Sequence, residues 1–124
     1  MADQQKYTIL IVDDEYFMLQ ALTATLSPHY TVLAAKDGCG AVAIAHKAMP
    51  DLILMDVIMP KMDGFEALAA LKASEATKHI PVILLSGLEE INTYAAAGAA
   101  DRIAKPFRPD DLKQKVQRQL GRRE

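Results

Sequence analysis

Short runs of aliphatic residues, each ending at a polar side chain, constrain the fold of this chain more than any other feature. The clearest run is residues 52–60, LILMDVIMP, in which Asp56 follows four apolar residues and precedes three more. Such runs are too short to cross a membrane, and they are typical of strands that are buried on both faces. A buried carboxylate is costly without a partner, so the position of Asp56 calls for an explanation.

Stretches with helical periodicity alternate with five expected strands. The expected strands are residues 7–12, 30–34, 52–55, 81–85 and 102–104, and the expected helices are residues 15–26, 41–48, 65–71, 89–97 and 109–120. Apolar side chains at Met18, Leu22 and Leu26 show the spacing of an amphipathic helix, and Gly98 is suited to end the short alanine-rich helix before it. Strands this apolar need cover on both faces. The pattern therefore predicts an α/β fold with a five-stranded parallel sheet flanked by five helices.

The composition fits a single globular domain. The chain has 124 residues, of which 51% are hydrophobic and 24% charged, so it can fill a sizeable core. We expect one domain over residues 1–124, with its core at about 6–120. The net charge of −2 gives no sign of a nucleic-acid-binding face, and the N-terminal MADQQK lacks the apolar core of a signal peptide. We expect a cytoplasmic protein that binds neither nucleic acid nor a membrane directly.

Polar side chains follow four of the expected strands at the point where each strand ends. Asp13 and Asp14 follow the first strand, Asp56 the third, Ser86 the fourth and Lys105 the fifth. In open parallel sheets, ligands bind beyond the carboxyl ends of the strands. These five side chains are therefore expected to meet at one edge of the sheet.

The grouping of three carboxylates, a hydroxyl and an ammonium indicates phosphoryl transfer to a carboxylate. Carboxylates that lie close together repel one another unless a cation intervenes, and Mg²⁺ (or Mn²⁺) is the natural partner for such oxygen ligands. Asp56 would be the nucleophile, while Lys105, Ser86 and the cation would stabilise the oxygens of the transferred group.

Each of these residues also has a purely structural interpretation. Asp56 can be a turn or cap residue, Asp14 the N-cap or first-turn acid of the first helix, Ser86 a turn hydroxyl and Lys105 a solvated surface lysine. Their coincidence at four strand ends favours the functional interpretation. The histidines share no spacing with one another or with the acids, and we interpret them as surface residues: His29, His46 and His79.

The sequence resembles the receiver domains of two-component response regulators, the CheY-like superfamily, over about residues 6–120. The matching stretches, in order, are ILIVDDE, PDLILMDVIMPKMDGFEAL, IPVILLSG and the AKPF at 104–107. The resemblance implies a flavodoxin-like sheet with strand order 2-1-3-4-5. It also implies that Asp56 accepts a phosphoryl group from a sensor histidine kinase or a histidine phosphotransfer protein. Signalling would then reach a downstream protein target or a fused output domain.

The resemblance implies roles for individual residues as well. The implied magnesium ligands are Asp13, Asp14, Asp56 and the backbone carbonyl of Ile58. Ser86 would be the switch hydroxyl and Lys105 the phosphate-binding lysine, followed by a cis peptide bond to Pro106. The resemblance also implies that the chain catalyses only its own magnesium-dependent phosphorylation and dephosphorylation and is otherwise not an enzyme.

Two features depart from the family pattern. Arg102 stands three residues before Lys105, where receivers usually carry a Tyr or Phe that turns inward on activation. Arg102 could change rotamer and pair with Glu89 or Glu90, or it could be a solvated arginine with no switch role. Ser86 and Lys105 are 19 positions apart (105 − 86), which predicts a short fourth helix. Both changes affect the face where receivers commonly meet partners, so we expect an atypical output face.

Two apolar positions near the site bear on the lifetime of a phosphoryl group. Ile58 and Leu88 lie two residues after Asp56 and Ser86, and neither carries a group that could hold an attacking water, which predicts slow self-dephosphorylation. The alternative function is that of a pseudo-receiver, an interaction module that works without phosphorylation. A phosphatase of the haloacid dehalogenase type is disfavoured, because it would need an aspartate at Ile58 and a cap domain.

Overall fold

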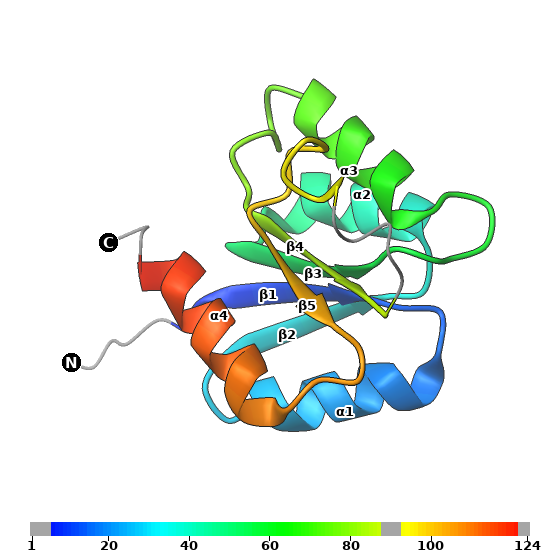
Figure 1. The fold of residues 1–124 in the computed structure, drawn as a ribbon. Coiled ribbons are helices and arrows are strands. Elements are labelled where there is room, and N and C mark those ends of the chain that lie inside the picture. Colours follow the sequence, from blue (N-terminus) through cyan, green and yellow to red (C-terminus); the bar gives the residue numbers. More distant parts are fainter. Residues whose placement is uncertain (1–5, 88–92, 122–124) are drawn as a thin grey trace.

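The computed structural model describes residues 6–87 and 93–121, which form a five-stranded parallel sheet with helices on both faces (Figure 1). The strand order is β2-β1-β3-β4-β5. The strands are β1 (Thr8–Val12), β2 (Thr31–Ala35), β3 (Leu52–Asp56), β4 (Val82–Ser86) and β5 (Asp101–Ala104). The α-helices in this part of the chain are α1 (Tyr16–Leu26), α2 (Gly38–Ala48), α3 (Gly64–Ala73) and α4 (Pro109–Gly121). The predicted fold class and strand order are confirmed.

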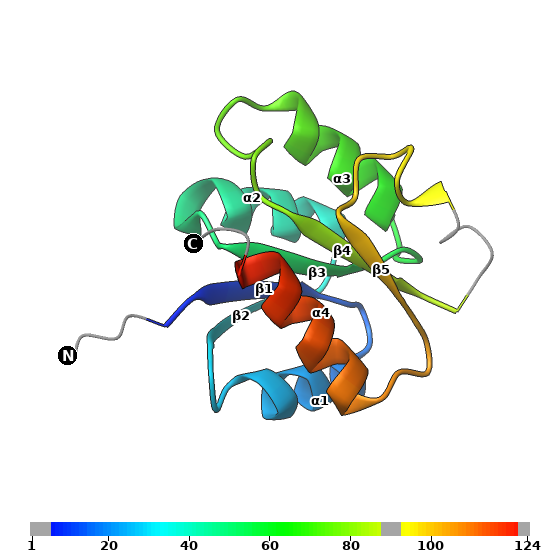
Figure 2. The ribbon, with the colours of Figure 1, turned by 60° about the vertical axis from the view of Figure 1, so that its left-hand side comes forward.

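The helices form two layers, with α1 and α4 on one face of the sheet and α2 and α3 on the other (Figures 1 and 2). Side chains alternate between these layers along each central strand. In β1, Leu10 and Val12 pack on the α2–α3 side, whereas Ile9 and Ile11 pack on the α1–α4 side. All five residues of β3 are buried, because both faces of this central strand are covered. The continuous apolar run before Asp56 is the consequence.

The first two helices begin at positions that differ from the sequence-based expectation. Helix α2 begins at Gly38, three residues earlier than predicted, because the Asp37 carboxylate accepts a hydrogen bond from the Gly40 amide (2.7 Å) and caps the helix. For α1, the alternative that Asp14 serves as the N-cap is wrong. The N-cap is Glu15, whose side chain makes no capping bond.

Of the short helix predicted at 89–97, residues 89–92 lie outside the described residues. Thr93 belongs to a 3₁₀ helix, and residues 94–98 form hydrogen-bonded turns in place of the rest of the predicted helix. The Ala97 amide donates to the Thr93 carbonyl (3.2 Å). Gly98 has a φ of +99°, and the chain turns there toward β5, at the residue predicted to end the helix. Within residues 6–87 and 93–121, none of the helices has both the length and the apolar character that a membrane crossing requires.

Candidate functional site

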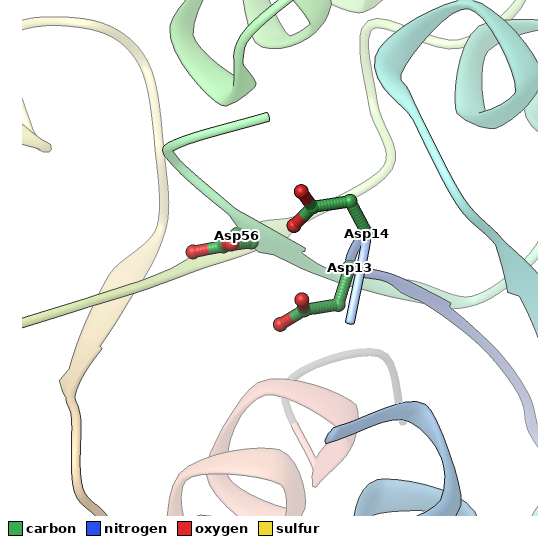
Figure 3. Close-up of side chains that lie close together, drawn as sticks. All are labelled: Asp13, Asp14 and Asp56. Atoms are coloured by element: carbon green, nitrogen blue, oxygen red, sulfur yellow. The ribbon is translucent and has the colours of Figure 1, made fainter. Parts of the chain in front are cut away.

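Three carboxylates meet where β1 and β3 end (Figure 3). Asp13 follows the last residue of β1, and Asp56 is the last residue of β3, the strand that pairs with β1. One carboxylate oxygen from each of Asp13, Asp14 and Asp56 lies within 4.8 Å of the others. Asp13 is fully buried and Asp56 is 7% exposed, while Asp14 is exposed to solvent. The sequence-based expectation that these three acids converge is confirmed.

Lys105 bridges the two buried carboxylates. Its Nζ lies 3.0 Å from Asp13 Oδ2 and 3.2 Å from Asp56 Oδ1. The Lys105 side chain is only 19% exposed, so the two ion pairs are largely shielded from water. Its backbone amide also donates to the Ser86 carbonyl (3.2 Å), which fixes the lysine at the end of the sheet. The interpretation of Lys105 as a solvated surface lysine is wrong.

The charges at the site are only partly balanced. Burial raises the pKa of Asp56, and the nearby negative charge of Asp13 raises it further, although Lys105 opposes both effects. For Lys105, burial by itself lowers the pKa, but the hydrogen bond to Asp13 and the charges of Asp13 and Asp56 outweigh burial, so the pKa is raised. The lysine is therefore held as a cation between carboxylates that still carry excess negative charge.

The carboxylates open into a pocket of about 320 Å³ at the carboxyl edge of the sheet. Its lining residues are Asp14, Glu15, Asp56, Ile58, Ser86, Gly87 and Lys105. Sequence reasoning missed Glu15 and Gly87, although each directly follows a residue that was predicted to belong to the site. At Gly87, a Cβ atom would lie 3.0 Å from the Lys105 carbonyl oxygen, so the close approach of the two backbones favours glycine.

Backbone contacts hold Asp56 from the side of α3. The Gly64 amide donates to the Val57 carbonyl (2.7 Å), and a Cβ atom on Gly64 would lie 2.3 Å from the Asp56 carbonyl oxygen. Helix α3 begins here with a capping box formed by Asp63 and Glu66. The start of α3 therefore packs directly on the backbone of the last β3 residue. This contact fixes the position from which the Asp56 side chain projects.

Arg102 lies in β5, away from the pocket. Its guanidinium carbon is 5.8 Å from the centroid of the Tyr94 ring, which is within the range of a cation–π contact. The partners suggested for it from the sequence, Glu89 and Glu90, lie outside the described residues. The Lys105–Pro106 peptide bond is cis, as the family resemblance implied.

Comparison with known families identifies the class of this domain. Residues 9–117 match the family model described as the response regulator receiver domain, and the chain belongs to this family. Receiver domains act in two-component signalling, together with histidine kinases or phosphotransfer proteins and with output domains.

Two curated relatives illustrate the match. Response regulator PleD of Caulobacter vibrioides is 41% identical over 108 residues, which are 84% of this chain and 23% of PleD. A probable cyclic di-GMP phosphodiesterase of Vibrio cholerae is 36% identical over 123 residues, which are 97% of this chain and 28% of that protein. The chain spans half the length or less of the curated relatives that it matches here.

Solved structures give the same result. Chemotaxis response regulator CheY4 of Vibrio cholerae superposes with a TM-score of 0.87 at 36% identity, covering 94% of this chain and 100% of CheY4. The receiver domain of sensor histidine kinase PA1611 from Pseudomonas aeruginosa gives 0.87 at 32% identity, covering 94% of this chain and 98% of that domain. The PA1611 domain holds a magnesium ion in its active-site cleft. The acidic cluster of the present chain has the donor chemistry for the same kind of ion.

Proposed function

We propose that this chain is a switching receiver in which Asp56 accepts a phosphoryl group from a phosphohistidine on a sensor histidine kinase or a histidine phosphotransfer protein. The observation that carries the proposal is the setting of Asp56, which faces a pocket next to Lys105 and two further carboxylates. In the transfer, an Asp56 carboxylate oxygen bonds to phosphorus as the phosphorus–nitrogen bond of the donor breaks. The donor imidazole keeps the electron pair of that bond and then takes up a proton.

The residues fit a divalent cation, Mg²⁺ or Mn²⁺. Asp13, Asp14 and Asp56 would hold it through their carboxylates, with the backbone carbonyl of Ile58 as a further ligand. Three acidic oxygens within 4.8 Å of one another, only partly offset by one lysine, form a site that favours a doubly charged hard cation. When bound, such a cation stabilises negative charge on phosphoryl oxygens.

Lys105 and Ser86 complete the proposed chemistry. The Lys105 ammonium already lies 3.2 Å from the Asp56 carboxylate, where it can donate to an oxygen of the transferred group. Ser86 lines the same pocket and supplies a hydroxyl, the group we propose as a switch that reorients toward the phosphoryl group. Catalysis of this kind depends mostly on positioning and charge stabilisation, which a rigid sheet edge provides.

We propose that the phosphorylated state is long-lived and that the chain acts on no substrate other than itself. Ile58 lines the pocket, is 54% exposed and offers no polar group to orient water, while Leu88 lies outside the described residues. A phosphoryl half-life of only seconds in the purified protein with Mg²⁺ would contradict this proposal.

The surface around the pocket supports a protein as the phosphodonor. Tyr16 and Phe17 are 67% and 82% exposed, and they closely follow the acids that end β1. With Ile58, they place large apolar side chains in the segments next to the pocket from which a donor histidine must approach Asp56. Exposed apolar groups of this size are typical of surfaces that contact a partner.

The proposal is tested with acetyl phosphate, a small donor that needs no docking surface. Wild-type protein with Mg²⁺ should gain the mass of one phosphoryl group, and Asp56→Asn should not. Asp110→Asn, which changes an exposed acid in the first turn of α4, should be phosphorylated like the wild type and serves as the matched control.

The pseudo-receiver alternative rests on Arg102 and on the short fourth helix, of which residues 94–97 form turns in the structure. Failure of the wild type to take up phosphoryl groups, with bound Mg²⁺ shown separately, would favour it. The cytoplasmic location, the absence of direct nucleic-acid binding, and signalling to a downstream protein target or a fused output domain stay predictions.

A further inference from the structure

Arg102 of the edge strand β5 contacts the segment 93–98, which precedes this strand. Ile103 packs on the α1–α4 side of the sheet, so its neighbour Arg102 projects to the opposite side. Tyr94 packs against the core on that opposite side, and its ring lies 5.8 Å from the Arg102 guanidinium carbon. The Arg102–Tyr94 contact, called the latch below, joins two segments of the chain.

The backbone of Arg102 is fixed independently of its side chain. Lys115 of α4 donates from Nζ to the Arg102 carbonyl, and its Nζ also lies 3.3 Å from Asp101 Oδ1. Strand β5 pairs with β4 along its length, and Leu84 lies opposite Arg102. These bonds hold the main chain of β5 in the sheet. A small displacement of β5 can therefore break the contact between Arg102 and Tyr94 while the sheet stays intact.

The latch and the acidic pocket lie at two ends of the same short strand. Ala104 pairs with Ser86, a pocket residue, and the Lys105 amide donates to the Ser86 carbonyl. Lys105 then reaches Asp13 and Asp56 with its ammonium group. Only four residues, 101–104, form β5, so a shift of Lys105 and Ser86 must be taken up within a few residues of Arg102.

We infer that the latch is closed when Asp56 is unmodified and opens when Asp56 is phosphorylated, which releases the segment 93–98 from β5. This inference rests on the proposed phosphorylation of Asp56. A phosphoryl group adds volume and negative charge to the pocket, and Lys105 and Ser86 must re-pair with its oxygens. The Arg102 guanidinium carbon lies 5.8 Å from the Tyr94 ring centroid, in the outer part of the cation–π range, so a displacement of β5 away from Tyr94 would weaken the contact.

Opening has a thermodynamic consequence that variants can measure. A ligand that favours the open state binds more tightly when the closed state is destabilised. Arg102 and Tyr94 are both half-buried, and a cation–π contact with only the strength found at exposed sites corresponds to an affinity increase of about two- to fivefold when it is removed. The probe is beryllofluoride with Mg²⁺, in which the beryllofluoride stands in for the phosphoryl group on Asp56.

Two variants of Tyr94 separate the ring contact from other effects. Tyr94→Leu should bind beryllofluoride about two- to fivefold more tightly than the wild type, and Tyr94→Phe, which keeps the ring, should bind like the wild type. Arg102→Gln should match Tyr94→Leu, and the double variant should add little, because both changes remove one contact. Unchanged or weaker binding in both single variants would overturn the inference, as would equal effects of Tyr94→Leu and Tyr94→Phe.

NMR of the wild type distinguishes failure of the latch from failure of the proposed function. Beryllofluoride with Mg²⁺ should shift the Gly87 amide at the pocket, together with the Arg102 Nε–H and the Tyr94 ring signals. A shift at Gly87 with unchanged Arg102 and Tyr94 signals would overturn the latch and leave the proposed function intact. Unchanged signals at all three residues would refute the proposed function, and the latch with it.

Discussion

Replacing Gly64 by alanine tests whether the contact between α3 and β3 positions Asp56. A Cβ atom at this residue would lie 2.3 Å from the Asp56 carbonyl oxygen and 2.8 Å from Val57 Cα. Ordinary van der Waals contact begins at 3.4 Å, so the backbones must separate by about 1.1 Å (3.4 − 2.3). Neither atom belongs to a flexible side chain. The separation must therefore move the start of α3 or the end of β3.

The expected loss of stability follows from two opposing effects. Overpacking of this kind costs about 1–3 kcal/mol, and the better helix propensity of alanine returns up to about 1 kcal/mol. We therefore expect Gly64→Ala to lower the free energy of unfolding by about 1–2 kcal/mol. For a chain of this length, that corresponds to a decrease in Tm of about 3–10 °C. Urea and thermal unfolding followed by circular dichroism measure both quantities.

The same substitution should also weaken magnesium binding. The clashing atom belongs to Asp56 itself, and a displacement near 1 Å is large compared with the tolerance of a coordinated site. We expect Mg²⁺ affinity, measured by calorimetry, to fall by about tenfold or more. Gly121→Ala at the end of α4 is the control, because a Cβ there would meet no neighbouring segment within 4 Å. It should leave Mg²⁺ affinity unchanged and should not lower the free energy of unfolding. Wild-type stability and Mg²⁺ affinity in Gly64→Ala would refute the reasoning.

Three further predictions concern charge, backbone strain and docking. Without Mg²⁺ at pH 7, Asp56→Asn should raise the free energy of unfolding, because burial raises the pKa of Asp56 and its ionised form therefore disfavours the folded state. This gain in stability should shrink as the pH falls through the pKa of Asp56 in the folded protein. Equal stabilities of variant and wild type in urea at pH 7 would contradict the prediction. Lys61 has a φ of 71° at the centre of a hydrogen-bonded three-residue turn, a backbone conformation that favours glycine. Lys61→Gly should therefore stabilise the protein by about 0.5–1 kcal/mol in thermal unfolding. Lys47→Gly, within α2, is the control and should destabilise the protein by a similar amount. Phe17→Ser should slow phosphoryl transfer from a phosphorylated histidine phosphotransfer protein and leave the rate with acetyl phosphate unchanged; equal slowing with both donors would exclude a docking role.

The sheet and its carboxyl edge could be predicted because they depend on local patterns. Each aliphatic run is long enough to form a strand and too short for a buried helix, and the polar residue after it marks where the strand ends. That is why the amino-acid sequence alone is sufficient to place Asp13, Asp56 and Ser86 at one edge of the sheet. Periodicity alone leaves the order of the strands open, and the order came from the family resemblance.

The features that the sequence did not predict depend on contacts between distant segments. The sequence places Lys105 at the same edge of the sheet, but it does not show that the ammonium group pairs with both Asp13 and Asp56, which lie 92 and 49 positions away (105 − 13 and 105 − 56). Arg102 contacts Tyr94, which the sequence did not predict, and residues 94–97 form turns where a helix was expected. The alternative of Asp14 as a cap failed because the main chain enters α1 one residue later, at Glu15. Helix propensity could not decide these outcomes, since tertiary contacts override it.

The excess negative charge of the acidic pocket bears both on the stability of the fold and on the proposed function. Asp13, Asp14 and Asp56 with Lys105 sum to −2 (−3 + 1) when all are ionised. The dianionic phosphoryl group of an approaching donor would face this excess at short range, and the buried setting screens it poorly. Burial is the main cause of the raised pKa of Asp56, and repulsion from Asp13 adds to it. With a divalent cation held by the carboxylates, the sum of charges would become zero (−2 + 2), which would offset that repulsion. The excess negative charge that raises the pKa of Asp56 is thus the property that would make the proposed phosphorylation of Asp56 depend on a cation.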